Sequence, residues 1–251
     1  MNLKQILLTF LENNLFLKNG TCPICGKVLF VTDRFLCRQC EDELPIINNP
    51  ICSQCGRPIF RPDRQLCAPC TKYNLPFAGG YAHLRYEDIG KNLVHAIKFK
   101  DRPHLGIWVG TQMGQAITQK SWVKEIDLII PVPLHPNRLA ERGYNQSEKI
   151  AQGILEAIIQ AGSNKIALSL GAQYLIRSRD TPHQIGQGRE ERLRNLTGAF
   201  TVAHIEAIQN KTILLVDDVL TTGATLAETS ATLLEAGAAR VCIATVCAVA
   251  E

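Results

Sequence analysis

The chain has 251 residues, of which 46% are hydrophobic and 20% are charged, and its formal net charge is +4. This is the composition of an ordinary globular protein with enough apolar residues for a full core. No apolar run approaches the roughly 20 residues that a membrane span needs, so the sequence predicts no such span. The small positive charge does not indicate a nucleic-acid partner, because eight cysteine thiolates that bind two zinc ions would bring it to about zero.

The N-terminal segment, residues 1–20, is predicted to hold an amphipathic helix over residues 1–17. One face of this helix would carry the apolar side chains of Leu3, Ile6, Leu7, Phe10 and Leu11. A glutamate and two asparagines interrupt the apolar stretch and no small-residue cleavage site follows, so the segment is not typical of a secretion signal. A helix that lies on a membrane surface is the alternative, although the polar face lacks the lysine and arginine cluster that such helices carry.

Two repeats of paired cysteines lie within residues 21–72, which we predict to be a double zinc-ribbon domain. In each repeat eleven residues separate two Cys-x-x-Cys pairs, and the eight cysteines are Cys22, Cys25, Cys37, Cys40, Cys52, Cys55, Cys67 and Cys70. Two such pairs joined by a hairpin place four thiolates around a structural zinc ion. The even spacing disfavours an iron–sulfur cluster, and the fourfold occurrence of the motif disfavours a dithiol redox site.

Pairing of ligands within each repeat is our interpretation, and exchange between the repeats is the alternative. Paired cysteines without a secretion signal indicate a reducing compartment, so we expect a cytoplasmic protein. Zinc ribbons often present basic and aromatic side chains to nucleic acid, and a solvated surface is the alternative role for such a set. The set here is Lys27, Arg34, Arg38, Arg57, Arg61 and Arg64 with Phe30, Phe35 and Phe60.

Residues 73–251 are predicted to form a second domain of alternating strands and helices. The apolar patterns predict, after a junction at residues 73–80, a strand over 81–86, an amphipathic helix through Ile89 to Ile97, a helix over 105–117, and strands over 126–130, 201–203 and 241–249. This order is typical of an α/β domain with a parallel sheet. The apolar last strand would bury Cys242 and Cys247 as core thiols.

A proline-rich loop, residues 131–147 (PVPLHPNRLAERGYNQS), follows the predicted strand at 126–130. Ligands bind at the carboxyl ends of the strands in open α/β sheets, so this loop is a candidate binding segment. Arg138 and Arg142 carry guanidinium groups that suit phosphate oxygens, and Asn145 and Gln146 can bind hydroxyls or a base. The alternative is a solvated loop whose arginines face water.

Residues 213–225 (ILLVDDVLTTGAT) show the most specific pattern in the chain. Four apolar residues predict a strand that is buried on both faces and ends at Asp217 and Asp218. A hydroxyl-rich turn then leads into a helix predicted over residues 225–236, with Thr225 as its cap. The N–H groups at a helix N-terminus favour a phosphate, and the adjacent acids suggest a ligand that also carries hydroxyls. An ordinary turn capped by one aspartate is the alternative, and it leaves the hydroxyl-rich loop unexplained.

This stretch resembles, at all thirteen positions, the phosphoribosyl pyrophosphate signature of the type I phosphoribosyltransferase family. The resemblance implies that family's α/β fold, a mostly parallel sheet flanked by helices, with the zinc-ribbon domain before it. It further implies that Asp217 and Asp218 contact the ribose 2- and 3-hydroxyls, and that Mg²⁺ is bound with the phosphoribosyl pyrophosphate. The residues that would wrap the 5-phosphate are Thr221, Thr222, Gly223, Ala224 and Thr225.

Together with the cysteine pairs and the loop at 131–147, the signature makes nearly the whole chain similar to the ComF family of competence-associated, phosphoribosyltransferase-like proteins, which includes GntX-type members. In type I phosphoribosyltransferases a mobile loop closes over the pyrophosphate, and its candidates here are Arg177, Arg179, Gln184 and Arg192. The predicted catalytic residues are Asp217, Asp218 and Arg142. Arg138, Arg142 and Arg179 are predicted to bind the pyrophosphate.

Three functions remain open from the sequence. The ComF resemblance implies a protein that binds phosphoribosyl pyrophosphate with Mg²⁺ and acts in natural transformation, handling incoming single-stranded DNA in the cytoplasm. The second is a true phosphoribosyltransferase that transfers phosphoribosyl to a base or amine in nucleotide metabolism, for which the sequence shows no acceptor pocket. The third is a scaffold whose zinc ribbons dock another protein, such as a competence helicase or an uptake component.

Overall fold

The computed structural model describes residues 20–29, 34–61, 63–99, 102–162, 168–180 and 195–251. The helix predicted over residues 1–17 lies outside the described residues, as do Phe30, Gln184 and Arg192. The chain divides into two compact units, residues 1–44 and residues 45–251, and the division falls between the two groups of cysteines.

The smaller unit is organised around the first cysteine group and has little regular secondary structure in its described part. Its first knuckle is closed by backbone hydrogen bonds, in which Cys22 N–H donates to the Lys27 carbonyl at 2.8 Å and Gly26 N–H donates to the Cys22 carbonyl at 2.9 Å. Gly26 has φ +76°, a conformation that favours glycine. Helix α2 (Arg38–Asp42) begins directly after the third cysteine.

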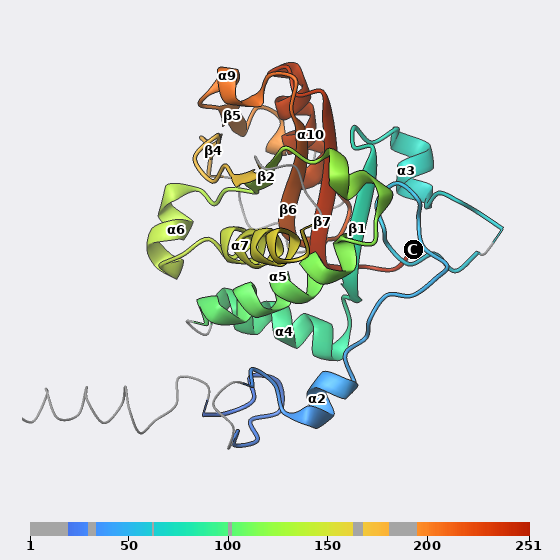
Figure 1. The fold of residues 1–251 in the computed structure, drawn as a ribbon, viewed down its shortest axis with the longest axis vertical. Coiled ribbons are helices and arrows are strands. Elements are labelled where there is room, and N and C mark those ends of the chain that lie inside the picture. Colours follow the sequence, from blue (N-terminus) through green and yellow to red (C-terminus); the bar gives the residue numbers. More distant parts are fainter. Residues whose placement is uncertain (1–19, 30–33, 62, 100–101, 163–167, 181–194) are drawn as a thin grey trace, which may run out of the picture. The chain divides into compact units, whose positions relative to one another are not determined.

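The larger unit is built on a five-stranded parallel sheet, which confirms the predicted α/β fold. The strands are ordered β1-β7-β6-β2-β3 across the sheet (Figure 1), with the bounds β1 Gly79–Arg85, β7 Arg240–Ala248, β6 Thr212–Leu220, β2 Leu128–Pro131 and β3 Ser169–Leu170. The last strand of the chain, β7, lies inside the sheet between β1 and β6. That place explains its apolar sequence, because an inner strand of a parallel sheet is covered on both faces.

One face of the sheet shares a buried cluster with helix α10 (Ala224–Glu235). Side chains alternate between the two faces of a strand, and the cluster accordingly takes Ile213 and Leu215 from β6 and Val241 and Ile243 from β7. The four cysteines of the second repeat belong to the same cluster. The second cysteine group is therefore part of the core of the larger unit.

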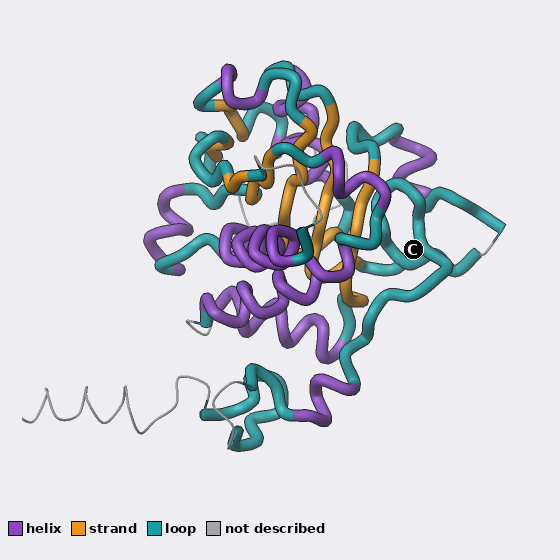
Figure 2. The backbone as a smooth tube through the Cα atoms, in the orientation of Figure 1, coloured by secondary structure: helices purple, strands orange, loops and turns teal. Residues whose placement is uncertain are grey.

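Helices α4 (Asp88–Phe99), α5 (Pro103–Ile117) and α7 (Gln146–Gln160) are grouped together (Figures 1 and 2). The axes of α5 and α7 approach closely, because a Cβ atom added at Gly110 would lie 2.1 Å from the Ile150 carbonyl oxygen. This packing fixes α7, whose first turn enters the candidate site. The shorter helices are α3 Ala68–Tyr73, η1 Ser121–Glu125, α6 Pro136–Arg142 and α9 Ile205–Ile208.

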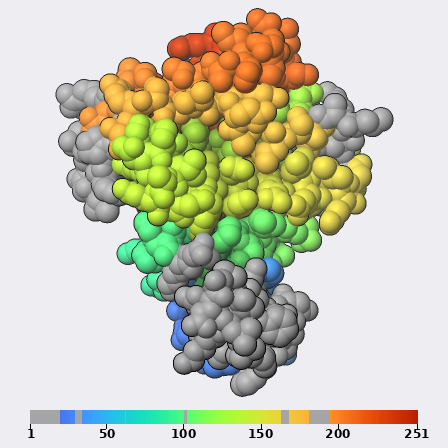
Figure 3. Space-filling model, turned by 90° about the vertical axis from the view of Figure 1, so that its left-hand side faces the viewer, coloured from blue at the N-terminus to red at the C-terminus, as the bar shows by residue number. Residues whose placement is uncertain are grey.

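A separate antiparallel pair is formed by β4 (Leu175–Arg177) and β5 (Phe200–Val202). Figure 3 shows the gold and orange surfaces of these segments next to the yellow-green surface of the α6 region. Arg177 was predicted to lie in a mobile loop, and this is wrong: it ends β4 and its side chain is 7% exposed. Pairing of β4 with β5 holds the backbone of Arg177, so the Arg177 side chain can reach the candidate site without a loop movement.

Candidate functional site

A cavity of about 450 Å³ opens at the carboxyl ends of β2 and β6. Ligands bind at this edge in open α/β sheets, because the loops and helix N-termini that follow the strands converge there. The lining residues are Tyr86, Lys98, Val132, Pro133, Leu134, Arg138, Arg142, Gln146, Arg177, Asp217, Asp218, Val219, Thr221 and Thr225. The structure thus brings the 131–147 loop and the 213–225 stretch, which are far apart in the sequence, to one cavity.

Asp218 is the most heavily paired acid of this cavity, and it is 5% exposed. Lys98 Nζ lies 2.8 Å from its Oδ1, and Gln146 Nε2 donates to its Oδ2 at 2.6 Å. Arg142 donates in turn to the side-chain oxygen of Gln146. Burial is the largest single influence on Lys98 and lowers its pKa, but the charge of Asp218, the hydrogen bond to it and the charge of Asp217 together raise the pKa. Lys98 therefore carries its charge inside the cavity.

Asp217 is bound differently, by neutral donors. Ser147 Oγ donates to its Oδ1 at 3.2 Å and the backbone N–H of Asp218 donates to the same atom at 2.9 Å. Burial first and the adjacent Asp218 charge second raise the pKa of Asp217 to about 7. At neutral pH Asp217 is therefore close to half-protonated, while Asp218 is paired with the Lys98 ammonium group.

The proline-rich loop places its polar residues by capping two helices. His135 caps α6, where its Nδ1 accepts from Asn137 N–H at 3.3 Å. Asn145 caps α7, because its Oδ1 accepts from Ser147 N–H at 3.0 Å while its Nδ2 donates to the Val132 carbonyl. The amide pair predicted to bind ligand is thereby split: Asn145 holds the loop, and its neighbour Gln146 reaches the acid pair.

Three arginines supply positive charge to the cavity. Arg138 Nε lies 3.6 Å from Asp180 Oδ1, Arg142 lies over the Phe99 ring, and Arg177 over the Phe200 ring. Burial lowers the pKa of both Arg142 and Arg177. Arg179, which the sequence also placed with the pyrophosphate, is not among the lining residues, and it donates to the carbonyls of Asn195 and Thr197 instead.

The hydroxyl-rich turn connects β6 to α10, and it differs in two ways from the prediction. The strand continues through the acid pair to Leu220, because β6 stays paired with β7 up to that residue. The helix cap is Gly223, at φ 78°, and not Thr225, which already lies in the first turn of α10. Thr221 and Thr225 line the cavity, and Thr222 Oγ1 accepts from Ala224 N–H at 3.4 Å.

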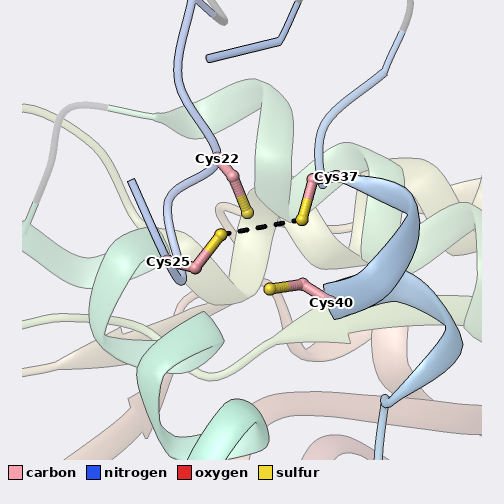
Figure 4. A group of neighbouring side chains, drawn as sticks. All are labelled: Cys22, Cys25, Cys37 and Cys40. Carbon is pink, nitrogen blue, oxygen red and sulfur yellow. Dashed lines mark hydrogen bonds between the residues drawn. The ribbon is translucent and has the colours of Figure 1, made fainter. Parts of the chain in front are cut away.

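The eight paired cysteines form two groups, each drawn from one repeat. The first is Cys22, Cys25, Cys37 and Cys40 (Figure 4), and the second is Cys52, Cys55, Cys67 and Cys70. In each group the four sulfur atoms lie within 4.8 Å of one another. Cys25 and Cys37 sulfurs are 3.6 Å apart and Cys55 and Cys67 sulfurs 3.7 Å apart. Zinc–sulfur bonds of about 2.3 Å in a tetrahedron require about 3.8 Å, so both groups fit zinc and the pairing within repeats is confirmed.

Sequence reasoning missed the ion pair of Lys98 and the place of Tyr86 in the lining. The sequence shows lysines along the helix that contains Lys98. Whether the Lys98 side chain points toward Asp218, however, depends on how α4 packs. Among the described residues, no helix is long and apolar enough to cross a membrane.

The chain matches two protein families. Residues 14–71 match a double zinc ribbon domain and residues 148–251 match a phosphoribosyl transferase domain. The DNA utilization protein YhgH of Salmonella typhimurium is 30% identical over 62% of this chain and 65% of its own length. Competence protein F of Haemophilus influenzae is 35% identical over 44% of this chain and 45% of its own. Competence protein ComFC of Streptococcus pneumoniae is 34% identical over 46% of this chain and 44% of its own.

The fold and the two cysteine groups therefore define a double zinc ribbon followed by a phosphoribosyltransferase-type domain. The chain is a homologue of YhgH, Competence protein F and ComFC, which confirms the resemblance to the ComF family. It spans about two thirds or less of the length of these relatives.

Proposed function

We propose that this chain binds phosphoribosyl pyrophosphate with Mg²⁺ in the cavity at the ends of β2 and β6. The observation that carries the proposal is the convergence of three kinds of group in that cavity. They are an acid pair, the N-terminus of α10 behind a threonine-rich turn, and three arginines. A ligand with a sugar diol, a monophosphate and a diphosphate matches these groups one for one.

Each group has a role that follows from its chemistry. The turn at residues 221–225 would hold the 5-phosphate with N–H and hydroxyl donors, since a helix N-terminus favours an anion. Asp217 and Asp218 would accept from the ribose hydroxyls, and Mg²⁺ bound with the ligand would offset the negative charge of the diphosphate. Arg138 and Arg142 would grip the diphosphate, because guanidinium matches phosphate oxygens in pairs.

Calorimetry with phosphoribosyl pyrophosphate and Mg²⁺ tests this proposal. The variant Asp217→Asn/Asp218→Asn keeps the shape of both side chains and removes their charges, so we expect its binding heat to be lost. Asp63→Asn is the matched control, because Asp63 is an exposed acid outside the cavity. Equal affinity of the wild type and of a folded double variant would show that the acid pair does not bind this ligand.

We further propose that the chain acts in natural transformation and handles single-stranded DNA. Two of its relatives are named a DNA utilization protein and a competence protein. Support comes from the end of the second ribbon, where Phe60 is 75% exposed and Arg61 and Arg64 are exposed beside it. An exposed ring next to basic residues in the sequence suits a stacked base and its phosphates. Arg57, which the sequence grouped with them, is 4% exposed and is not part of this surface.

Binding of a fluorescent oligothymidine at several salt concentrations tests the DNA proposal. We expect Phe60→Ala to weaken binding at every salt concentration, and Arg61→Ala/Arg64→Ala to reduce the salt dependence by about 0.7 per lost phosphate contact. Arg38→Ala is the control, because Arg38 is exposed on the first ribbon and pairs with Asp42. Unchanged binding by both test variants would show that DNA does not bind at this surface. Absence of binding by the wild type would favour the scaffold function, in which the ribbons dock a helicase or uptake component.

Transfer of phosphoribosyl to an acceptor is the second candidate activity, and it rests on Asp217. A carboxyl group whose pKa is about 7 can take up a proton at neutral pH, as general base catalysis requires. In this reaction the acceptor nitrogen would bond to C1 of the ribose, pyrophosphate would leave, and the acceptor proton would pass to Asp217. Pyrophosphate release measured with a panel of bases and amines tests the activity, and binding without release from any of them would exclude it for that panel.

A further inference from the structure

Arg57 connects the second zinc ribbon to the candidate phosphate turn. Its Nη2 donates to the carbonyl oxygen of Thr221 at 2.7 Å, across 164 positions of the sequence. The Arg57 side chain is 4% exposed, and the hydrogen bond is partly shielded from water. A hydrogen bond from a charged donor is among the stronger hydrogen bonds of a protein.

The backbone on the ribbon side of this contact is fixed by the cysteine knuckle. Cys52 N–H donates to the Arg57 carbonyl at 2.8 Å, and Gly56 N–H donates to the Cys52 carbonyl at 2.9 Å. The knuckle also lies directly against β1, because a Cβ atom added at Gly56 would be 2.9 Å from the Gly80 carbonyl oxygen. Arg57 is thus held from both sides, by the metal site and by the edge strand of the sheet.

Electrostatic attraction also favours the position of the Arg57 side chain beside the second cysteine group. Zinc with four thiolates carries a net charge of about −2, which attracts a neighbouring guanidinium group. Arg57 lies two positions after Cys55, one of the four ligands of this group. Loss of the metal would therefore loosen both the backbone and the electrostatic restraint on Arg57.

On the other side of the contact, the hydrogen bond orients one peptide unit of the turn. The carbonyl of one residue and the N–H of the next point in opposite directions across a trans peptide bond. With the Thr221 carbonyl directed at Arg57, the N–H of Thr222 is directed away from the ribbon. This orientation removes a carbonyl oxygen, which would repel a phosphate, from the anion-binding side of the turn.

We propose that Arg57 is a positioning residue that holds the turn at residues 221–225 in its phosphate-binding form. The inference rests on the proposed binding of phosphoribosyl pyrophosphate. Arg57 acts through the Thr221 carbonyl, so it contributes to affinity without touching the ligand.

The first ribbon offers a matched control at the same position of the repeat. Lys27 follows the first knuckle as Arg57 follows the second, and its carbonyl accepts from Cys22 N–H at the same 2.8 Å. Its Nζ donates to Gln39 Oε1 at 2.6 Å, within its own ribbon. A change at Lys27 therefore removes a basic residue from a knuckle without reaching the turn.

Amide hydrogen exchange and calorimetry on Arg57→Ala and Lys27→Ala, both with zinc bound, test the inference. We expect Arg57→Ala to speed exchange at residues 222–225 and to weaken phosphoribosyl pyrophosphate binding about tenfold or more, and Lys27→Ala to change neither. Wild-type exchange and affinity in Arg57→Ala would overturn the inference. If the wild type itself does not bind the ligand, the proposed function fails, and the exchange difference still decides whether Arg57 holds the turn.

Arg57→Lys keeps the test decisive if Arg57→Ala does not fold. Lysine retains the positive charge beside Cys55 but lacks the planar guanidinium group that reaches the Thr221 carbonyl. We expect this variant to keep two zinc ions per chain, by metal analysis, and to lose the exchange protection of the turn. Full protection together with full affinity in Arg57→Lys would show that charge alone suffices and would overturn the role of the hydrogen bond.

Discussion

The two cysteine groups have the same spacing but very different surroundings. In the first, Cys25 is exposed and Cys37 is half-buried, whereas all four cysteines of the second are at most 3% exposed. The glycines after the first cysteine pairs show the same contrast. A Cβ atom at Gly26 would meet nothing within 4 Å, and one at Gly56 would collide with the backbone of β1. A repeated motif therefore specifies the metal geometry and leaves the role of each site to its neighbours.

The contrast extends to what each metal site stabilises. The first group belongs to the small unit of residues 1–44, and the second shares a buried cluster with α10 and the central strands of the larger unit. Because the binding energy of a structural zinc ion is folding energy, the second ion should stabilise the ligand domain and the first should stabilise only its own ribbon.

The largest expected effect comes from removing one metal ligand in each group. Cys67→Ser should lower the melting temperature of the larger unit by about 10 °C or more, because a buried site loses its metal and the core cluster loses its centre. Cys37→Ser should leave that transition unchanged and abolish one zinc ion per chain. Scanning calorimetry with metal analysis measures both quantities.

A shift of the melting temperature in Cys67→Ser but not in Cys37→Ser would establish that only the second metal site stabilises the larger unit. Equal shifts of the same transition in Cys67→Ser and Cys37→Ser would mean that the two ribbons fold as one unit with the ligand domain. No shift in either variant would mean that the second ribbon docks on a domain that is already stable without it.

A smaller effect is expected from the two knuckle glycines. Both have φ +76°, so an alanine at either position costs about 1 to 2 kcal/mol of the free energy of unfolding. At Gly56 the new methyl group would also lie 2.9 Å from Gly80 O and Ala82 N, which adds about 1 to 3 kcal/mol of overpacking. Urea unfolding of Gly56→Ala and Gly26→Ala should show the excess loss in the first. Equal losses would indicate that the ribbon can move away from β1.

Local patterns predicted much of this molecule. The strand, acid pair and turn at residues 213–225 were recognisable because a buried strand, two acids and a helix start are contiguous in the sequence. The ligand sets of both zinc sites were predictable for the same reason, since spacing within a repeat limits which thiols can meet. The parallel sheet followed from the alternation of apolar strands and helices.

Contacts between distant segments could not be read in this way. Nothing near Arg57 in the sequence distinguishes it from the equivalent Lys27, and only packing against the turn makes it buried. Gln146 and Lys98 meet Asp218 because α7 and α4 both place a side chain in the cavity. Thr225 was mistaken for a helix cap because the left-handed Gly223 starts the helix earlier. These features arise from tertiary structure and leave no local signal.

The smallest expected effect is the pH dependence of the free energy of unfolding that comes from Asp217, a residue of the larger unit. Its folded-state pKa of about 7 is above the ordinary carboxyl value of 3.8, so the folded state holds the proton more tightly than the unfolded state does. Stability must then fall as the pH rises toward 7, because the unfolded chain ionises first. From about pH 5.5 to about pH 7 the free energy of unfolding should drop by about 2 kcal/mol, at about 1.4 kcal/mol for each pH unit.

Asp217→Asn should remove this drop, and the difference between its pH profile and that of the wild type isolates the contribution of one carboxyl group. The drop should persist in Cys37→Ser, since the first ribbon belongs to the other unit. A wild-type profile as flat as that of Asp217→Asn would mean that the acid is ionised throughout. In that case Asp217 would be too weak a base to take up the acceptor proton at neutral pH, and only the binding role of the acid pair would remain.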